Sequence, residues 1–235
     1  MKAYYDLHIH SCLSPCADND MTPNNIANMA VLAGLDIIAL TDHNSCKNCP
    51  ALKDAAMCAG VEFVPGMELC TAEECHVICL FPTLKAAMEF DELVERSLPP
   101  IQNDVEIFGQ QLIMNNTDHV TASYPYMLAA ATSISIDNVA ALVWQYGGVA
   151  IPAHIDRPSF SVTANLGTVP DFGFCAFESI SRNVNELVSK YPVLEKHPLL
   201  FNSDAHMLSQ VQDKGPWLEV EKCNADSLIS ALESN

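Results

Sequence analysis

The chain has 235 residues, and its 29 aspartates and glutamates outnumber its 11 lysines and arginines, giving a formal net charge of −18 at pH 7. Hydrophobic residues make up 49% of the chain, enough to bury a core, which excludes a disordered protein. We expect one domain, residues 1–235, of α/β type. The acidic balance argues against a long nucleic acid as partner unless bound cations offset it.

The N-terminus has no charged segment followed by an apolar run, as a secretion signal would have. Apolar stretches stay shorter than the roughly 18 residues that a membrane span requires. We therefore expect a cytoplasmic protein that does not contact a membrane. The sequence leaves the oligomeric state open.

The first expected strand contains the motif Asp6-Leu7-His8-Ile9-His10. Side chains alternate between the faces of a strand, so the two imidazoles point the same way, roughly 6–7 Å apart. This is a spacing for metal ligands, although paired histidines on one strand face can also be ordinary polar surface.

Alternating strands and helices follow. Thr22-Pro23 marks the start of a helix that Gly34 ends. The apolar run at residues 36–40 predicts a strand covered on both faces, and it leads into Thr41-Asp42-His43-Asn44. A short helix over residues 51–59 and strands over 61–68 and 76–81 complete this part.

Residues 84–147 interrupt the pattern. We predict helices at residues 86–96, 101–114, 127–131 and 136–146, with no strand among them. This helical insertion either covers the mouth of a barrel as a lid or thickens its outer ring of helices. Strands are expected again at residues 149–154, 174–178, 199–206 and 217–220, followed by a helix that begins after Asn224.

Most histidines fall at the predicted ends of strands, and two acids, Glu68 and Asp204, share that placement. In a parallel barrel these ends meet on one face, where such folds assemble their active sites. Burying many imidazoles and carboxylates without a cation would leave costly unpaired polar groups. The pattern therefore predicts a metal site.

The sequence resembles the PHP (polymerase and histidinol phosphatase) family along nearly its whole length. The matching motifs are His8-Ile9-His10-Ser11, Thr41-Asp42-His43-Asn44, Pro65-Gly66-Met67-Glu68, His76, Ala153-His154 and Ser203-Asp204-Ala205-His206. The resemblance implies a distorted (β/α)7 TIM-like barrel that binds two or three divalent ions, Zn, Mn or Fe. The implied ligands are His8, His10, Asp18, His43, Glu68, His76, His154, Asp204 and His206.

The resemblance also assigns these ligands to individual ions. Glu68 bridges two ions; His8, His10 and Asp204 complete one site, and His76 and His154 the next. Asp18, His43 and His206 hold a third. The sequence departs from the family pattern around Asp18: the family usually has Ser-Asp-Gly soon after the two histidines, whereas this loop is longer. Counting back from Thr22-Pro23 favours Asp18, with Asp20 as the alternative.

These ligands imply a phosphoesterase. Clustered cations lower the pKa of a bridging water, and the resulting hydroxide, held by Glu68, His8, His10 and Asp204, can attack phosphorus. We expect a hydrolase that acts on a small phosphorylated metabolite or nucleotide. A non-catalytic PHP scaffold and a metal-dependent amidohydrolase on the same barrel are the alternatives.

Two further groups of residues are candidates near the site. Arg157 and Arg182 follow strand ends and could bind substrate phosphate, or they could be ordinary surface arginines. Cys12, Cys16 and the Cys46-x-x-Cys49 pair flank the metal motifs. They could form a second metal or redox site, or remain ordinary reduced cysteines.

Overall fold

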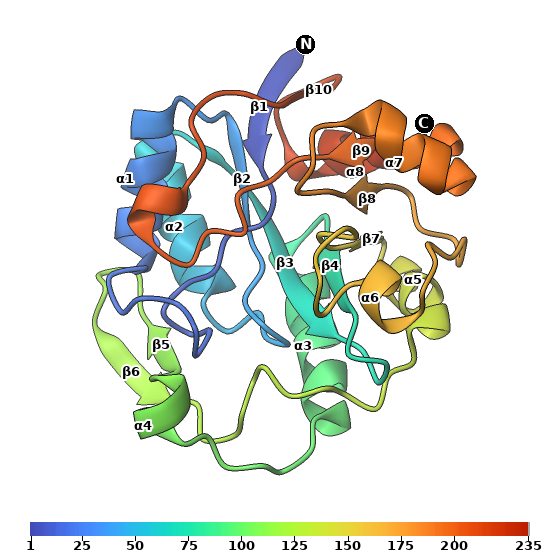
Figure 1. The fold of residues 1–235 in the computed structure, drawn as a ribbon. Helices are drawn as coiled ribbons and strands as arrows, with labels where there is room; N and C mark the ends of the chain where they lie inside the picture. The colour runs from blue at the N-terminus through green and yellow to red at the C-terminus, as the bar shows by residue number, and fades with distance from the viewer. Residues whose placement is uncertain (235) are drawn as a thin grey trace.

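A six-stranded sheet forms the centre of the computed structural model, which describes residues 1–234 (Figure 1). Its order is β10-β1-β2-β3-β4-β7. The strands are β1 (Lys2–Asp6), β2 (Ile37–Leu40), β3 (Glu62–Cys70), β4 (His76–Leu80), β7 (Val149–Pro152) and β10 (Trp217–Glu219). β1, β2 and β3 are parallel, as predicted, because helical crossovers join them.

The crossover helices begin and end where the sequence predicts. α1 (Pro23–Ala33) starts at Thr22, whose side chain accepts a hydrogen bond from the Asn25 N–H, and it ends at Gly34 with φ 69°. α2 (Cys49–Ala59) ends in the same way at Gly60. Both helices lie on the same side of the sheet and bury their apolar faces in the larger core cluster.

The fourth strand reverses the direction of the sheet. β4 is antiparallel to both β3 and β7. Only residues 71–75 join β3 to β4, and a parallel crossover needs a dozen or more residues, so this connection can only form a hairpin. The expectation of an all-parallel barrel was wrong here. The reversal pairs His76, the first residue of β4, with Cys70, the last residue of β3. It therefore places His76 at the edge where β1, β2 and β3 end.

The sheet curls into half a barrel, and short segments occupy the remaining side. β8 (Phe177–Glu178) and β9 (Leu199–Leu200) form a separate parallel pair. Hydrogen bonds outside the named strands link this pair and its neighbouring loops to the main sheet: the Ile155 N–H, for example, donates to the Glu178 carbonyl at 2.9 Å, and Ile9 forms a parallel bridge with Ala205. A complete seven-stranded barrel is not present within residues 1–234.

The C-terminal part supplies the remaining helices. They are α6 (Val162–Asn165), α7 (Val184–Lys190), the 3-10 helices η1 (Pro192–Lys196) and η2 (Leu208–Gln210), and α8 (Ala225–Glu233). α8 packs on the second core cluster, which faces the opposite side of the sheet from α1 and α2. In β2, Ile38 and Leu40 belong to the first cluster and Ile37 and Ala39 to the second, as strand alternation requires.

The predicted helical insertion is only partly helical. α3 (Leu84–Ser97) and α5 (Ile136–Trp144) form near the expected bounds, but the middle contains a single helical turn, α4 (Val105–Phe108), and an antiparallel hairpin of β5 (Leu112–Met114) and β6 (Val120–Ser123). The helices predicted at residues 101–114 and 127–131 were therefore wrong, apart from the single turn of α4 within the first range. The turn Asn115-Asn116-Thr117-Asp118 between two apolar runs is a hairpin signal.

The hairpin is fastened to the N-terminal part of the fold. Asp118 accepts hydrogen bonds from the Thr22 hydroxyl at 2.6 Å and the Asn24 N–H at 3.1 Å, at the start of α1. The Leu112 N–H donates to the Cys12 carbonyl at 2.8 Å. The insertion therefore packs against the loop that follows β1. No helix among residues 1–234 combines the length and apolarity that crossing a membrane requires.

Candidate metal centre

The two histidines after β1 lie side by side. His8 and His10 are fully buried, and their Nε2 atoms are 3.1 Å apart. The His10 N–H donates to the Ala205 carbonyl at 2.9 Å, which ties this segment to the loop after β9. The two imidazoles therefore point to one place, as their spacing in the sequence predicts.

Glu68, near the end of β3, lies at the centre of the site. Its side chain is 1% exposed and is surrounded by imidazoles. One oxygen, Oε1, lies 3.2 Å from His8 Nε2, 2.9 Å from His76 Nδ1 and 3.1 Å from His154 Nε2. The other oxygen, Oε2, lies 3.3 Å from His10 Nε2 and 2.9 Å from His43 Nδ1. One carboxylate thus joins two groups of nitrogen atoms, which is the arrangement of a bridging ligand.

Asp204 and His206 close the site from the loop after β9. Asp204 Oδ1 lies 3.3 Å from the Nε2 atoms of both His8 and His10, and 3.6 Å from His206 Nδ1. The His206 ring stacks on His10 with centroids 4.2 Å apart. Asp204 and His154 have positive φ values of 51° and 30°. Such left-handed backbone is strained for residues other than glycine and persists where surrounding contacts require it.

The donor set fits divalent cations. Buried side-chain atoms without a hydrogen-bond partner in the described chain include His43 Nδ1, Glu68 Oε2, His154 Nδ1 and Asp204 Oδ1. Leaving such an atom unsatisfied costs about 1–3 kcal/mol. Three groups have ligand atoms within 4.8 Å of one another: His8, His10 and Asp204; His43, Glu68 and His76; and His10, His43 and His206. Imidazole with carboxylate suits Zn, Mn and Fe.

The pKa values within the site reflect burial opposed by charge. Burial lowers the pKa of His10 and His43, but neighbouring carboxylates outweigh it and raise both to about 9: Asp204 and Glu68 at His10, and Glu68 at His43. Burial dominates at His76 and lowers its pKa to about 4. Although burial raises the pKa of Glu68, the imidazoles hold it well below its usual range. Because ligating histidines must be neutral, a divalent ion bound here would replace these protons.

A buried acid that was not among the predicted site residues orients two of the histidines. Glu178, in β8, is 3% exposed, and both of its carboxylate oxygens lie 3.0 Å from His8 Nδ1. It also accepts the His154 N–H at 2.8 Å and the Asn202 side-chain amide at 2.7 Å. A carboxylate on the far nitrogen of a ligating imidazole fixes its tautomer. The sequence did contain a signal for this role, because Glu178 is an acid at the end of the strand predicted at residues 174–178.

Asp42 acts through Ser14. Its carboxylate accepts hydrogen bonds from the Ser11 N–H at 2.7 Å and from the Ser14 hydroxyl at 2.8 Å. The Ser14 hydroxyl in turn lies 2.9 Å from His10 Nδ1 and accepts the His43 N–H at 3.1 Å. Asp42 therefore positions the loop that supports His10.

Both candidate arginines line one cavity beside the metal ligands. It measures about 380 Å³, and His154, Asn202 and Asp204 also line it. Arg157 Nη1 lies 3.0 Å from Asp204 Oδ2, and the Arg182 guanidinium lies 5.6 Å from the centre of the Phe201 ring. A neighbouring cavity of about 470 Å³, lined by His43, Glu68, His76 and His206, shares Arg157 and Asp204 with the first.

Every predicted ligand except Asp18 reaches the site. Asp18 is exposed and belongs to none of the three ligand groups; its backbone N–H donates to the His206 carbonyl at 2.9 Å. Asp20 is exposed as well.

The cysteines near the motifs differ in their surroundings. Cys46 and Cys49 are buried, and both thiols donate to the Gly66 carbonyl, at 3.1 and 3.5 Å. Burial raises the pKa of Cys12 to about 12. Cys16, in contrast, lines the 470 Å³ cavity with the metal ligands.

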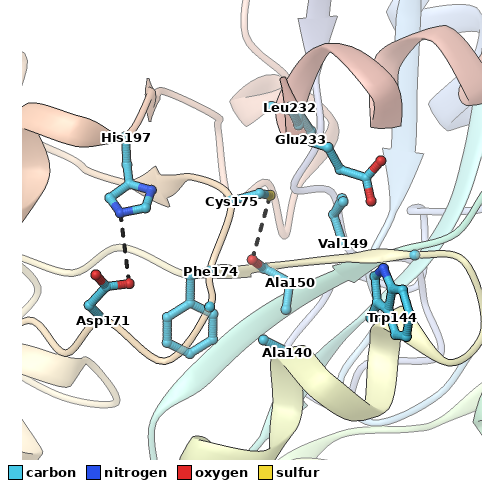
Figure 2. A pocket seen from close by; sticks show the side chains of 12 residues that line it. Ala140, Trp144, Val149, Ala150, Asp171, Phe174, Cys175, His197, Leu232 and Glu233 are labelled. Atoms are coloured by element: carbon cyan, nitrogen blue, oxygen red, sulfur yellow. Dashed lines mark hydrogen bonds and ion pairs between the residues drawn. The ribbon is translucent and has the colours of Figure 1, made fainter. Parts of the chain in front are cut away.

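The remaining histidines lie outside the metal centre. His119 is exposed in the insertion, where its ring contacts Thr117. His197 lies in a separate cavity of about 380 Å³ between α5, α8 and the segment before β8 (Figure 2). Trp144, Phe174 and Cys175 line that cavity, and it contains none of the predicted ligands.

Solved structures share this fold. Endonuclease Q from Pyrococcus furiosus, described as lesion-specific, matches 100% of this chain and 56% of its own, with a TM-score of 0.72 and 21% identity. A putative metal-dependent phosphoesterase from Bifidobacterium adolescentis matches 97% and 95%, with a TM-score of 0.62 and 18% identity. A 5'-3' exoribonuclease from Haemophilus influenzae is 32% identical over 71 residues, 30% of this chain and 25% of its own. The chain thus spans about half of the endonuclease and a quarter of the exoribonuclease.

These structures correct the exclusion of long nucleic acids. Endonuclease Q has also been solved with a 27-mer duplex substrate that has an abasic lesion at the active site; that structure matches this chain with a TM-score of 0.70 and 20% identity. The inference from net charge was wrong, because charge summed over a whole chain does not describe the local potential of a site. Here bound cations and Arg157, which lies 3.0 Å from Asp204, would offset the acids of the site locally.

The family follows from the sequence match. The model of the PHP domain matches residues 6–163, which contain the ligand motifs from His8 to His154; Asp204 and His206 lie beyond the matched segment and complete the same cluster in space. The chain belongs to the PHP domain family.

Proposed function

We propose that this protein is a metal-dependent phosphoesterase that binds two or three divalent ions around Glu68. His8, His10 and Asp204 would hold one ion, His76 and His154 a second, and His43 and His206 a third, with Glu68 between the first two. Such ions, when bound, lower the pKa of a coordinated water and neutralise charge on phosphoryl oxygens.

The position of Glu68 is the observation that carries this proposal. One fully buried carboxylate lies within 3.3 Å of five imidazole nitrogens, and one of its own oxygens has no hydrogen-bond partner. A site of this kind is costly for a protein that uses it only for stability. Cations explain the convergence, and they suit hydrolysis of a phosphate ester.

The chain itself would position the ligands and the substrate. Glu178 holds His8 in the tautomer that leaves Nε2 free for an ion. Arg157 and Arg182 line the cavity next to Asp204, where a planar guanidinium can contact two phosphate oxygens. Both cavities have the size of small-molecule pockets. We therefore expect the reacting phosphate to lie near Arg157, which the two cavities share.

The substrate we expect is a phosphorylated metabolite or nucleotide, with the phosphate as a monoester. A nucleic-acid strand, whose internal phosphates are diesters, is the second candidate substrate, because the chain shares its fold with endonuclease Q.

A substrate panel tests the proposal directly. Phosphomonoesters, nucleotide 3′,5′-bisphosphates, short oligonucleotides, duplex DNA with an abasic site and a set of amides would each be incubated with the protein and Mn, Zn or Fe. We expect phosphoester hydrolysis that stops when a chelator removes the metal. Hydrolysis that survives chelation would contradict the proposal, and so would turnover of amides alone. Metal binding without any turnover would favour a non-catalytic scaffold.

The role of Arg157 has its own test. Arg157→Ala should raise KM for the phosphoester about 10–100-fold, because a charge-assisted contact is worth roughly 1.5–3 kcal/mol. Arg96→Ala is the matched control: Arg96 forms an exposed pair with Glu92 at 3.4 Å on α3. An unchanged KM in Arg157→Ala would remove this residue from the substrate site.

A further inference from the structure

An exposed aromatic side chain, Phe160, borders the cavity that contains the metal ligands. It lines the 470 Å³ cavity together with Glu68, His76 and Arg157. Its ring stacks on the imidazole of His76, with ring centroids 4.9 Å apart and an angle of 24° between the ring planes. The residue nevertheless remains 39% exposed. Contact with His76 thus leaves part of Phe160 open to solvent and available to a ligand.

The backbone of Phe160 is strained. Its φ of 54° lies in the left-handed region, which bulky side chains rarely adopt. Its carbonyl accepts the His76 N–H at 3.0 Å, so the main chain is held by the same residue on which the ring stacks. Such strain costs stability and is concentrated at active sites and ligand clamps. An exposed side chain gains little from burial, so packing of this ring accounts poorly for the strain.

Phe160 and Arg157 belong to one short loop between His154 and α6. The Arg157 N–H donates to the His154 carbonyl at 2.9 Å. The buried Ser161 hydroxyl donates to the Arg157 carbonyl at 2.6 Å and accepts the Ala164 N–H at 3.1 Å, in the first turn of α6. These bonds hold the loop close to the predicted ligand His154. The loop therefore presents a cation and an aromatic ring to the same cavity.

A guanidinium and an aromatic ring are complementary to two parts of a nucleotide. Arginine contacts phosphate oxygens in pairs, and a nucleobase stacks on an aromatic ring through its π-face. A cavity of about 470 Å³ also lies within the range of pockets for small ligands. We propose that Phe160 binds the nucleobase of the substrate by stacking, while the phosphate lies between Arg157 and the metal ions.

This role makes Phe160 a specificity-determining residue, because no bond forms or breaks at it. Stacking does not read the hydrogen-bonding edge of a base, so Phe160 selects for the presence of a base and tolerates any base. The inference rests on the proposed phosphoesterase function. It makes a nucleotide, rather than a phosphorylated metabolite without an aromatic ring, the preferred substrate.

A fluorescent nucleotide analogue tests the stacking without any turnover. The fluorescence of 2-aminopurine falls when the base stacks on an aromatic ring. Its riboside, with a non-hydrolysable phosphonate at the 5′ or the 3′ position, would be added to Zn-loaded protein. We expect quenching in the wild type and in Phe160→Tyr, and its loss in Phe160→Leu. Phe172→Leu is the matched control, because Phe172 is 40% exposed and does not line the cavity.

Substrates that differ in the base separate binding of the base from support of His76. Adenosine 5′-monophosphate and ribose 5-phosphate have the same phosphorylated sugar, with and without a base. In Phe160→Leu we expect kcat/KM for the nucleotide to fall about 5–150-fold, the range for one stacked base, and kcat/KM for the sugar phosphate to stay unchanged. Metal content should also stay unchanged, since leucine still covers His76.

Three results would overturn the inference: wild-type protein without quenching, quenching that persists in Phe160→Leu, or an equal loss of activity on both substrates. Loss of metal in Phe160→Leu would instead assign the ring to the support of His76. A wild type that hydrolyses the sugar phosphate as well as the nucleotide would keep the proposed activity and contradict the role of Phe160. Quenching that depends on Phe160, without turnover of any phosphoester, would keep the base site and contradict the proposed activity.

Discussion

Two cavities of this molecule each place a histidine beside a carboxylate, but only one is built to hold cations. In the metal centre, His43 Nδ1 and Glu68 Oε2 lie 2.9 Å apart with side chains 7% and 1% exposed. In the cavity between α5 and α8, His197 Nε2 and Asp171 Oδ1 lie 3.9 Å apart, and the Asp171 side chain is 58% exposed (Figure 2).

The difference lies in what surrounds each pair. Glu68 is enclosed by further imidazoles, and several buried atoms there lack partners. His197 packs its ring edge against Phe177, with centroids 5.3 Å apart, and Asp171 keeps its contact with water. A solvated pair gains little from its partner, whereas buried and incompletely paired groups require a cation. Buried polar side chains that lack hydrogen-bond partners therefore identify a metal centre better than the mere presence of a histidine beside a carboxylate does.

Of the substitutions considered, removing the central carboxylate should have the largest effect on the metal centre. Glu68→Gln keeps the shape of the side chain but removes the charge that joins the two groups of nitrogens. We expect bound metal to fall and phosphoester turnover to drop about a thousandfold or more, since metal stabilisation is worth several kcal/mol. Metal content and kcat/KM measure this, with circular dichroism to confirm folding. A variant with normal metal content would mean that Glu68 is not a bridging ligand.

The stability that bound metal adds to the protein should grow as the pH rises. His10 and His43 have pKa values raised from 6.5 to about 9. In chelator-treated protein their paired, charged forms stabilise the fold below pH 6.5, and this stabilisation, on the order of a few kcal/mol, is lost as the pH rises to 9. Metal binding requires neutral imidazoles, so metal-loaded protein should gain in relative stability over the same range.

Urea unfolding at pH 6.5 and pH 9, with and without Zn, measures this difference. Buried thiols such as Cys12 also affect stability near pH 9, but they contribute equally to both forms of the protein. If the gap between loaded and stripped protein failed to widen with pH, protons and metal would not compete for the same nitrogens.

Glu178→Gln should have a smaller effect at the same centre. The variant weakens the hydrogen bond that fixes the tautomer of His8, so we expect metal affinity to fall about 10–100-fold while folding persists. Glu186→Gln on α7, an exposed acid, is the control. Metal titration by calorimetry gives the answer, and equal affinities in both variants would leave Glu178 with a purely structural role.

Asp171→Asn should have the smallest effect, and it tests the other side of the comparison. A pair at 3.9 Å with an exposed acid contributes little, so unfolding free energy should change by less than about 0.5 kcal/mol, and metal content should stay the same. A loss of metal in this variant would show that the second cavity is coupled to the centre.

Local signals in the sequence were sufficient for much of the fold and the site. Thr22, Pro23 and Gly34 fix the ends of α1 through a side-chain cap, a restrained φ and a left-handed residue, all of which act within one helical turn. The His8 and His10 spacing and the placement of Glu68 at a strand end likewise survive folding unchanged. Such features depend on neighbours a few residues away, so they can be read from the chain alone.

Other features depended on which distant segments pair. The short link between β3 and β4 reverses the sheet, and the Asn115–Asp118 turn makes a hairpin where helices were expected. Glu178 reaches His8 across 170 positions, and Cys16, rather than Asp18, faces the cavity. The sequence by itself determined which types of side chain could bind the metal and at which edge of the sheet they would lie. Only the tertiary structure decided which donors meet, because strand direction and loop anchoring result from long-range contacts that residue patterns do not encode.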